Sequence, residues 1–182
     1  GLTPPAICSN TNFSYNPSSA TAGTTFAWSR AAVAGISNPA ATGFNNPNEI
    51  LINTAATAVS VIYVYTLTAN GCSNTQNVTV VVRPRPTLTS SLTPPAICSH
   101  TFFNYTPTSG TPGTFFSWSR AVVAGISNPP GSGNGSIHES LINTTPNPVN
   151  VTYVYTLTAA GCSNTQNVVV TVNPRPTLTS TT

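Results

Sequence analysis

The stretch VSVIYVYTLT, residues 59–68, decides the fold of this chain. Its odd-numbered positions hold Val, Val, Tyr, Tyr and Leu, whereas its even-numbered positions mix polar and apolar residues. A period of two predicts a β-strand with one buried face. The pair Asn70-Gly71 then gives a turn signal, and apolar residues alternate again over residues 78–82. We therefore predict a β-hairpin that turns at Asn70-Gly71.

Shorter strands are predicted before this hairpin. Phe26 and Trp28 share one face of a strand, and residues 49–54 form another. Residues 35–48 have the composition of a loop or an irregular edge, and no stretch has a helical period. The pattern predicts an all-β fold, an antiparallel β-sandwich of immunoglobulin type. Its core is expected around four aromatic residues, Trp28, Tyr63, Trp118 and Tyr153.

The sandwich is expected twice. Residues 92–180 repeat residues 2–90 at an offset of 90 positions, without a gap and with about two thirds of positions identical. We predict a first repeat at 1–86, a linker at 87–91, a second repeat at 92–176 and the start of the next linker at 177–182. Both ends resemble the interior of the linker, which favours two periods of a longer array. A repeated module disfavours a single active site.

Each repeat contains two cysteines, 64 positions apart in both copies. We expect one disulfide inside each repeat, Cys8 with Cys72 and Cys98 with Cys162. On the chain-entropy model such a loop stabilises by about 4 kcal/mol. Zinc is the alternative, but two thiols without a repeated histidine cannot fill four ligand positions. Disulfides indicate an oxidising, extracellular compartment.

Charge is scarce in this chain. It contains five arginines, two glutamates, no lysine and no aspartate. Dispersed arginines do not form the basic patch that nucleic acid requires, so nucleic acid is not an expected partner. The longest apolar run falls short of the roughly 18 residues of a membrane-spanning helix, and direct membrane insertion is not expected either.

Two opposite charges recur in both copies. Arg30 with Glu49, and Arg120 with Glu139, are interpreted as structural ion pairs that join the Trp-bearing strand to the next one. The alternative is a polar recognition point on an exposed sheet face.

The linker region carries a second recurring feature, arginine between prolines. Proline fixes φ and prevents the preceding strand from continuing, so a stiff joint is expected. Arg85 and Arg175 either contact the adjacent module or remain solvated. The joint residues are Pro84, Arg85, Pro86, Pro174, Arg175 and Pro176.

Catalytic and cofactor sites are not expected. His100 and His138 have no counterparts in the first copy, and each repeat has one carboxylate, which suits neither a triad nor a calcium site. The copies diverge most at residues 40–48 and 130–138. Variable loops on a rigid frame are where binding often resides, although unconstrained loops diverge too. Surface glycans are therefore an alternative partner.

The module resembles the PKD-like repeat of Bacteroidetes surface proteins. The resemblance is carried by motifs in fixed order over nearly the whole chain, twice: Cys8-Ser9, Phe13-Ser14-Tyr15, Thr24-Thr25-Phe26-Ala27-Trp28-Ser29-Arg30, Gly35-Ile36, Glu49, Leu51-Ile52-Asn53-Thr54, Tyr63-Val64-Tyr65 and Gly71-Cys72-Ser73-Asn74. It implies two tandem immunoglobulin-like or PKD-like sandwiches within a large secreted adhesin or filament on the bacterial cell surface. It implies no catalytic residues.

The function predicted from the sequence is structural. We expect a spacer segment of an extracellular filament or adhesin stalk, whose partners are neighbouring repeats of the same chain and identical chains. A glycan- or surface-binding module that acts through exposed aromatic residues or the two loops is the alternative, and a self-assembling fibre subunit is a third.

Overall fold

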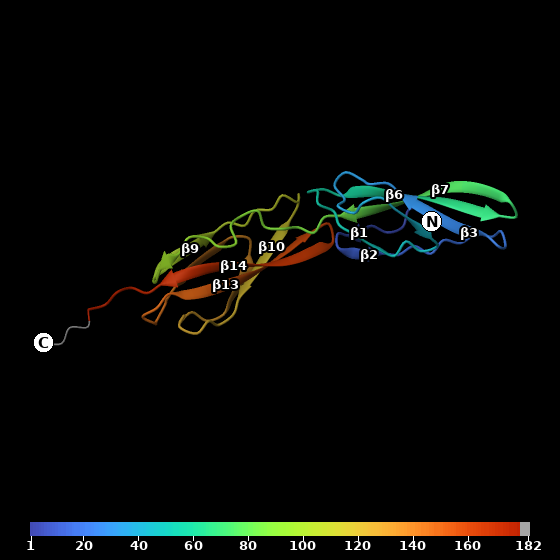
Figure 1. Ribbon diagram of the computed structural model, residues 1–182. Coiled ribbons are helices and arrows are strands. Elements are labelled where there is room, and N and C mark those ends of the chain that lie inside the picture. Colours follow the sequence, from blue (N-terminus) through green and yellow to red (C-terminus); the bar gives the residue numbers. More distant parts are fainter. Residues whose placement is uncertain (179–182) are drawn as a thin grey trace. The chain divides into compact units, whose positions relative to one another are not determined.

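The structure, a computed structural model, describes residues 1–178 (Figure 1). Within these residues every regular element is a β-strand. Those of the first repeat are β1 (Ile7–Cys8), β2 (Thr11–Phe13), β3 (Thr25–Arg30), β4 (Ala41–Phe44), β5 (Glu49–Leu51), β6 (Val59–Ala69) and β7 (Cys72–Arg83). Those of the second are β8 (Ile97–Cys98), β9 (Thr101–Tyr105), β10 (Phe115–Arg120), β11 (Gly131–Asn134), β12 (Ile137–Leu141), β13 (Val149–Ala159) and β14 (Cys162–Asn173).

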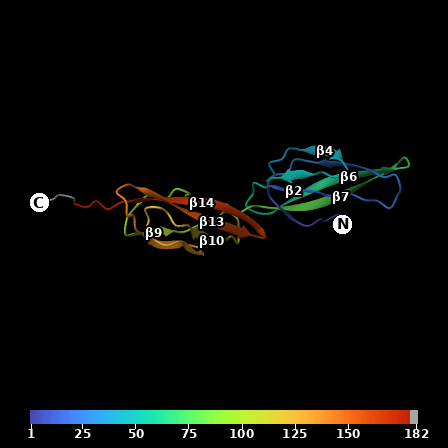
Figure 2. The same cartoon turned by 90° about the horizontal axis from the view of Figure 1, so that it is seen from below.

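The strands form two compact units that do not coincide with the repeats. The first unit contains Gly1–Arg85 together with Ala160–Cys162, and the second contains Pro86–Ala159 and the chain from Ser163 onward. In the first unit a five-stranded sheet has the order β1-β7-β6-β3-β4, and a two-stranded sheet pairs β2 with β5. Figure 2 shows β4, an edge strand of the larger sheet, on the other side of β6 from β7. Most pairs are antiparallel, but β1 pairs with β7 in parallel.

The hairpin predicted from residues 59–68 is present as β6 and β7. Val61, Tyr63 and Tyr65 are buried, as the alternation predicts. Asn70 and Gly71 have φ angles of 51° and 77°, which the tight turn between antiparallel strands requires. The buried face of β6 packs with Phe13, Leu51 and the valines of β7 in one apolar cluster. Each large side chain that is fully buried contributes about 1.5–3 kcal/mol.

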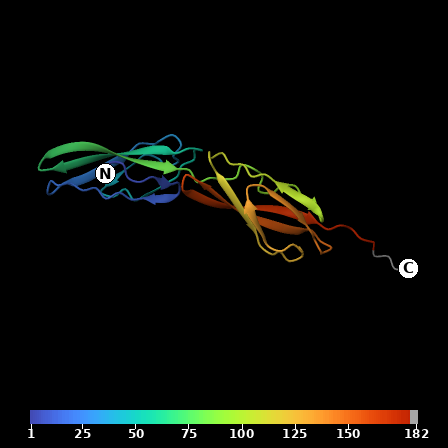
Figure 3. The same ribbon diagram turned by 180° about the vertical axis from the view of Figure 1, so that it is seen from behind.

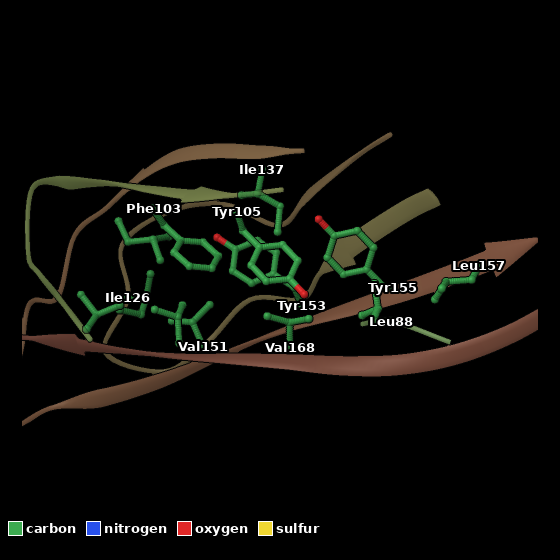
Figure 4. Close-up of a cluster of buried hydrophobic side chains, with 13 residues drawn as sticks. Leu88, Phe103, Tyr105, Ile126, Ile137, Val151, Tyr153, Tyr155, Leu157 and Val168 are labelled. Atoms are coloured by element: carbon green, nitrogen blue, oxygen red, sulfur yellow. The ribbon is translucent and has the colours of Figure 1, made fainter. Parts of the chain in front are cut away.

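The second unit repeats this architecture. Its sheets have the orders β11-β10-β13-β14-β8 and β12-β9. Figure 3 shows the yellow-green strand β9 apart from the orange β13 and the red β14. Figure 4 shows the core of this unit, a single apolar cluster that contains Phe103, Tyr153, Tyr155 and Val168. The predicted fold class, two tandem all-β sandwiches, is therefore confirmed.

One replacement explains a difference between the two-stranded sheets. Pro47 of the first repeat corresponds to Ile137 of the second, and Asn48 next to the proline has a positive φ of 48°. Proline has no N–H to donate, so β5 starts only at Glu49. Ile137 is 1% exposed and pairs with Tyr105, which lets β12 start two positions earlier.

The predicted linker at 87–91 lies inside the second unit. Leu88 is 9% exposed, belongs to the apolar cluster of that unit and forms a β-bridge with Ser109. The sequence suggested a linker because prolines flank it, but burial of Leu88 anchors the segment. Of the predicted linker at 177–182, Thr177 and Leu178 are exposed, and residues 179–182 lie outside the described residues.

No helix in the part of the chain that the structure describes is long and apolar enough to cross a membrane.

Candidate functional site

The first candidate site is the buried ion pair. Arg30 at the end of β3 binds Glu49 at the start of β5 through two hydrogen bonds, Nε to Oε2 and Nη2 to Oε1, both 2.9 Å. Its Nη2 also donates to the Pro39 carbonyl at 2.8 Å, and Tyr63 donates its hydroxyl to Glu49 at 2.6 Å. The side chain of Arg30 is 1% exposed and that of Glu49 is 18% exposed. The pair connects the larger sheet to the smaller one.

The electrostatics of this network suit a permanent ion pair. Burial raises the pKa of Glu49, but the hydrogen bonds from Arg30 and Tyr63 outweigh burial and hold that pKa below its ordinary value. The hydrogen bond to Glu49 raises the pKa of Arg30 despite burial. Burial and the bond to Glu49 raise the pKa of Tyr63. All three groups therefore keep one protonation state near neutral pH, which suits a structural role better than proton transfer.

The second unit contains the same network. Arg120 bonds to Glu139 at 3.1 and 3.2 Å, and Tyr153 donates to Glu139 at 2.6 Å. Burial raises the pKa of Glu139, and the hydrogen bonds from Arg120 and Tyr153 outweigh it, so this pKa is also lowered. The recurrence shows that each repeat builds its network from its own residues.

The predicted core tryptophans lie beside these networks. Trp28 contacts the ring of Tyr63 edge-on, with centroids 5.4 Å apart, and Trp118 contacts Tyr153 in the same way at 5.5 Å. A Cβ on Gly43 would lie 2.6 Å from the Trp28 ring, so glycine is what lets β4 cross the indole. Trp28 is 7% exposed and packs in the core of the sandwich.

The predicted cysteine pairing is wrong. The structure contains a disulfide between Cys8 and Cys162, with Cα atoms 5.7 Å apart. Both cysteines lie in the first unit, because that unit includes Ala160–Cys162. Cys72 and Cys98 are exposed and form no disulfide within the described residues.

Strand register explains the error. Cys8 on β1 pairs with Arg83 at the end of β7, whereas Cys72 is the first residue of β7. At about 3.3 Å per residue the two ends of β7 lie about 35 Å apart. A disulfide needs Cα atoms within about 7 Å, so Cys8 cannot reach Cys72. Equal spacing in both repeats suggested a bond within each repeat, but it equally suits a bond from one repeat to the next.

The hairpin turn of the second repeat is held next to this disulfide. Arg83 donates Nη1 to the Ala160 carbonyl at 2.8 Å. A side chain on Gly161, whose φ is 80°, would start 3.6 Å from the same guanidinium. Position 83 is arginine in the first repeat and asparagine at the corresponding Asn173. No sequence signal singled out Arg83.

A second feature that the sequence did not reveal is the cradle around residues 86–90 in the second unit. Gln166 accepts the N–H of Leu88 at 2.6 Å, and Asn164 donates to the carbonyl of Pro86 at 3.0 Å. The Leu88 side chain enters the core, where Figure 4 shows it beside Tyr155.

The rest of the segment is bound as firmly. The N–H of Thr89 donates to the Thr108 carbonyl at 2.8 Å, and the hydroxyls of Ser90 and Tyr105 are 2.7 Å apart. The residues from Leu88 to Ser90 therefore lie along the second unit as an added strand would.

The proline-flanked joints differ in exposure. Pro84 and Pro86 are buried, whereas Pro174 is half-buried and Pro176 is exposed. Arg85 is exposed but has an interaction partner, and Arg175 is exposed. That these arginines contact an adjacent module stays a prediction.

The divergent loops carry different surfaces. Residues 40–48 contain β4 and present Phe44, which is 76% exposed. In residues 130–138, His138 stacks on Phe102 with ring centroids 4.3 Å apart and hydrogen-bonds to Asn104. Among the described residues no three His, Cys, Asp or Glu side chains gather as metal ligands would.

Comparison with known families adds the decisive observation. A family model described as "PKD-like domain" matches residues 5–86 and again residues 95–176. The chain belongs to the PKD-like domain family. The resemblance of the sequence to PKD-like repeats is thereby confirmed. Tandem PKD-like domains indicate a structural or adhesion module, and such domains with a disulfide are typical of extracellular proteins.

Solved structures align with this chain at low identity. The IG1 and IG2 domains of DIP-gamma align at 13% identity, a TM-score of 0.39, and coverage of 93% of this chain and 94% of theirs. Mouse protocadherin-24 EC1-3 aligns at 13% identity and a TM-score of 0.43, covering 96% of this chain and 62% of that one.

An endo-fucoidan hydrolase of glycoside hydrolase family 107 aligns at 11% identity and a TM-score of 0.36, over 96% of this chain. This PKD-like pair spans 28% of the length of that hydrolase. No curated protein is similar enough in sequence to count as a match.

Proposed function

We propose that this pair of PKD-like domains is a non-catalytic, load-bearing section of a bacterial extracellular filament or adhesin stalk, of the kind that Bacteroidetes export to the cell surface. Its partners are neighbouring repeats of the same chain and identical chains in the filament. The disulfide between Cys8 and Cys162 is the observation that carries the proposal.

This disulfide shortens the path that tension follows. Cys8 belongs to the first repeat and Cys162 to the second, and their sequence separation is 154. A pull on the two ends of the chain passes through the sulfur atoms and bypasses every residue between them. Both ion pairs and the aromatic residues of both cores lie in the bypassed interval, so tension does not act on the backbone that carries them. Residues 163–173 of β14, with the core valines Val168, Val170 and Val172, stay in the loaded path.

The cradle in the second unit supports the same role. When the disulfide is reduced, residues 86–90 enter the loaded path. A flexible linker would then extend first, whereas these residues are hydrogen-bonded along the unit that they enter. Low charge fits the role too, because five arginines and two glutamates repel neighbouring chains only weakly. A stalk needs length and resistance to extension, and both follow from repeating this module.

Force spectroscopy on the whole chain tests the proposal. With the disulfide intact, only residues 1–7 and 163–182 can extend when the ends are pulled, by at most about 100 Å even if β14 is pulled out of its sheet. In Cys8→Ser the whole chain becomes extensible, to about 600 Å. Cys72→Ser is the matched control, because this cysteine is outside the bond and its variant should extend as the parent does. An oxidised parent chain that extends as far as Cys8→Ser would contradict a load-bearing bond.

A second candidate function, recognition of surface glycans, is favoured by the exposed aromatic residues. Phe102 is 55% exposed and stacks on His138 beside the divergent loop, and Phe44 is 76% exposed in the other copy. Flat exposed rings are suitable platforms for sugar rings. A glycan array probed with the parent chain and with Phe102→Ala tests this candidate, and specific binding that the substitution abolishes would favour it over a purely structural role.

A further inference from the structure

The polar residues that hold residues 86–88 in the second unit recur in the first unit, where they line an open cavity. Ser109, Asn164 and Gln166 contact residues 86–88 in the second unit. Their counterparts at the offset of 90 are Ser19, Asn74 and Gln76, and all three line a cavity of about 300 Å³ in the first unit. The cavity therefore presents the same hydrogen-bonding groups that hold residues 86–88.

The apolar part of the cradle is also repeated. Leu157 is fully buried in the cluster that contains Leu88, whereas its counterpart Leu67 lines the cavity and is only partly buried. Tyr15, the counterpart of Tyr105, lines a second small cavity together with Leu67. A leucine entering from outside would complete this cluster as Leu88 completes the other.

The chain also carries a second copy of the segment that the cradle holds. Residues 84–90 and 174–180 have the same sequence, Pro-Arg-Pro-Thr-Leu-Thr-Ser. Leu178 is 98% exposed, and the corresponding Leu88 is 9% exposed. The same leucine is thus part of a core in one place and surrounded by solvent in the other.

The two unpaired cysteines match this arrangement. Cys72 lines the open cavity, is exposed and corresponds to the bonded Cys162. Cys98, also exposed, corresponds to the bonded Cys8. The cavity thus has a thiol, that of Cys72, at the position that corresponds to Cys162. The second repeat, which carries Leu178, has a thiol, that of Cys98, at the position that corresponds to Cys8.

We propose that the cavity of the first unit is a docking site for another copy of this repeat. The incoming copy inserts the leucine of its Pro-Thr-Leu segment beside Leu67 and Tyr15, and its Cys98 forms a disulfide with Cys72. The first repeat carries the acceptor and the second carries the donor. Such a head-to-tail contact is heterologous, so copies add one after another unless the rotation between them closes a ring.

The covalent step is a thiol–disulfide exchange. A small-molecule disulfide, such as oxidised glutathione, first forms a mixed disulfide with one thiolate and releases one small thiol. The second cysteine then attacks, and a second small thiol leaves. The S–S bond that forms replaces the S–S bond of the oxidant, and the two protons of Cys72 and Cys98 end on the two released thiols.

Oxidation of the chain itself tests the pairing. In a glutathione redox buffer the parent chain should form a ladder of oligomers on a non-reducing gel, and peptide mapping should find Cys72 bonded to Cys98. Random pairing would instead give the mixed bond in only half of the new disulfides, with Cys72–Cys72 and Cys98–Cys98 sharing the rest. That distribution, or a chain that stays monomeric, would overturn the proposal.

Two complementary variants sharpen this test. Cys72→Ser retains only the donor thiol and Cys98→Ser only the acceptor thiol. On the non-reducing gel each variant alone should run as a monomer, and an equimolar mixture should give a disulfide-bonded dimer and no larger species. Dimers of either variant alone would show that the thiols react without the docking site.

A further pair of variants tests the leucine. Leu178→Asp lies on an exposed terminal segment, so it leaves both units folded while placing a charge where the cavity requires an apolar side chain. It should slow dimer formation by about tenfold or more, whereas Phe44→Asp, an exposed residue outside the cavity, should leave the rate unchanged. Equal rates for both variants would remove the segment from the proposal.

A chain extended by a third copy, residues 91–180 repeated at its C-terminus, separates a tandem neighbour from a second molecule. Cys98 should bond to the hairpin cysteine of the added copy, and ladder formation through Cys72 should continue. A bond between Cys98 and Cys162 would overturn the proposal. The docking site would exist whether or not the Cys8–Cys162 disulfide carries tension. The force measurement and the oxidation experiments therefore test the two proposals separately.

Discussion

The buried ion pairs are the same in the two repeats, whereas the hairpin ends differ between them. Arg30 and Arg120 make the same bonds to glutamate and are both 2% exposed. At the hairpin ends the copies differ, because Cys162 is 1% exposed and bonded while Cys72 is exposed and unpaired. The ion pair of a repeat is therefore made by that repeat alone, whereas the state of its hairpin end is set by a segment from outside it.

The largest expected effect comes from breaking an ion pair. Arg30→Leu leaves Glu49 mostly buried without its cation, and loss of one partner from a buried pair costs about 3–5 kcal/mol. Arg120→Leu should destabilise the second unit by a similar amount. Calorimetric unfolding of both variants measures this. A clear difference between the two would contradict the equivalence of the networks.

A somewhat smaller effect separates the two leucines of the joint. Leu88→Ala should lower the free energy of unfolding of the second unit by about 2–3 kcal/mol, because it opens a space in the core. Leu178→Ala should have no measurable effect, since Leu178 is 98% exposed. Urea denaturation of the pair gives the comparison, and equal effects would mean that Leu88 is not anchored.

The glutamates should make stability depend on pH. The pKa values of Glu49 and Glu139 are lowered below the ordinary value of 4.5, so the unfolded chain binds protons at a higher pH than the folded one. Their contribution is therefore fully present above about pH 4.5 and is lost as the pH falls through the lowered values. The melting temperature of both units should drop in that window.

Glutamine variants provide the control for this pH dependence. Glu49→Gln should reduce the fall in melting temperature at low pH for the first unit and leave that of the second unit unchanged, while Glu139→Gln should do the reverse. If the fall at low pH remains in both variants, groups other than these glutamates cause it.

The smallest expected effect concerns a single hydrogen bond in the cradle. Asn164→Ala removes the bond to the Pro86 carbonyl and should cost the second unit about 1 kcal/mol. Asn74→Ala, at the corresponding position in the open cavity, should stay within about 0.5 kcal/mol of the parent chain. Chemical denaturation in the reduced and oxidised states measures both, and a cost at Asn74 equal to that at Asn164 would erase the contrast.

Much of the fold could be predicted because its signals are local. The alternation over residues 59–68 identified β6 and its buried face, and Asn70-Gly71 identified the turn. The recurrence of Arg30 and Glu49 at a fixed spacing suggested an ion pair, which the structure contains. These features depend on residues that belong to one repeat.

The disulfide and the cradle could not be predicted in the same way. Nothing near Cys8 in the sequence indicates that β1 runs parallel to the far end of β7. Prolines around Leu88 suggest an exposed linker, and only the fold places Tyr155 and Leu157 beside this leucine. Both features join segments that are distant in sequence.

The sequence by itself determined that this protein is a repeated β-sandwich, with a core and an ion pair built twice from the same residues. Strand periodicity and turn chemistry act over a few residues, and copying a module copies them. The tertiary structure alone decided which cysteines meet and where Leu88 is buried, because these depend on strand register and on the packing of separate segments. Identical residues thus differ in burial and bonding, since Leu88 and Cys162 have a partner segment beside them and Leu178 and Cys72 are exposed.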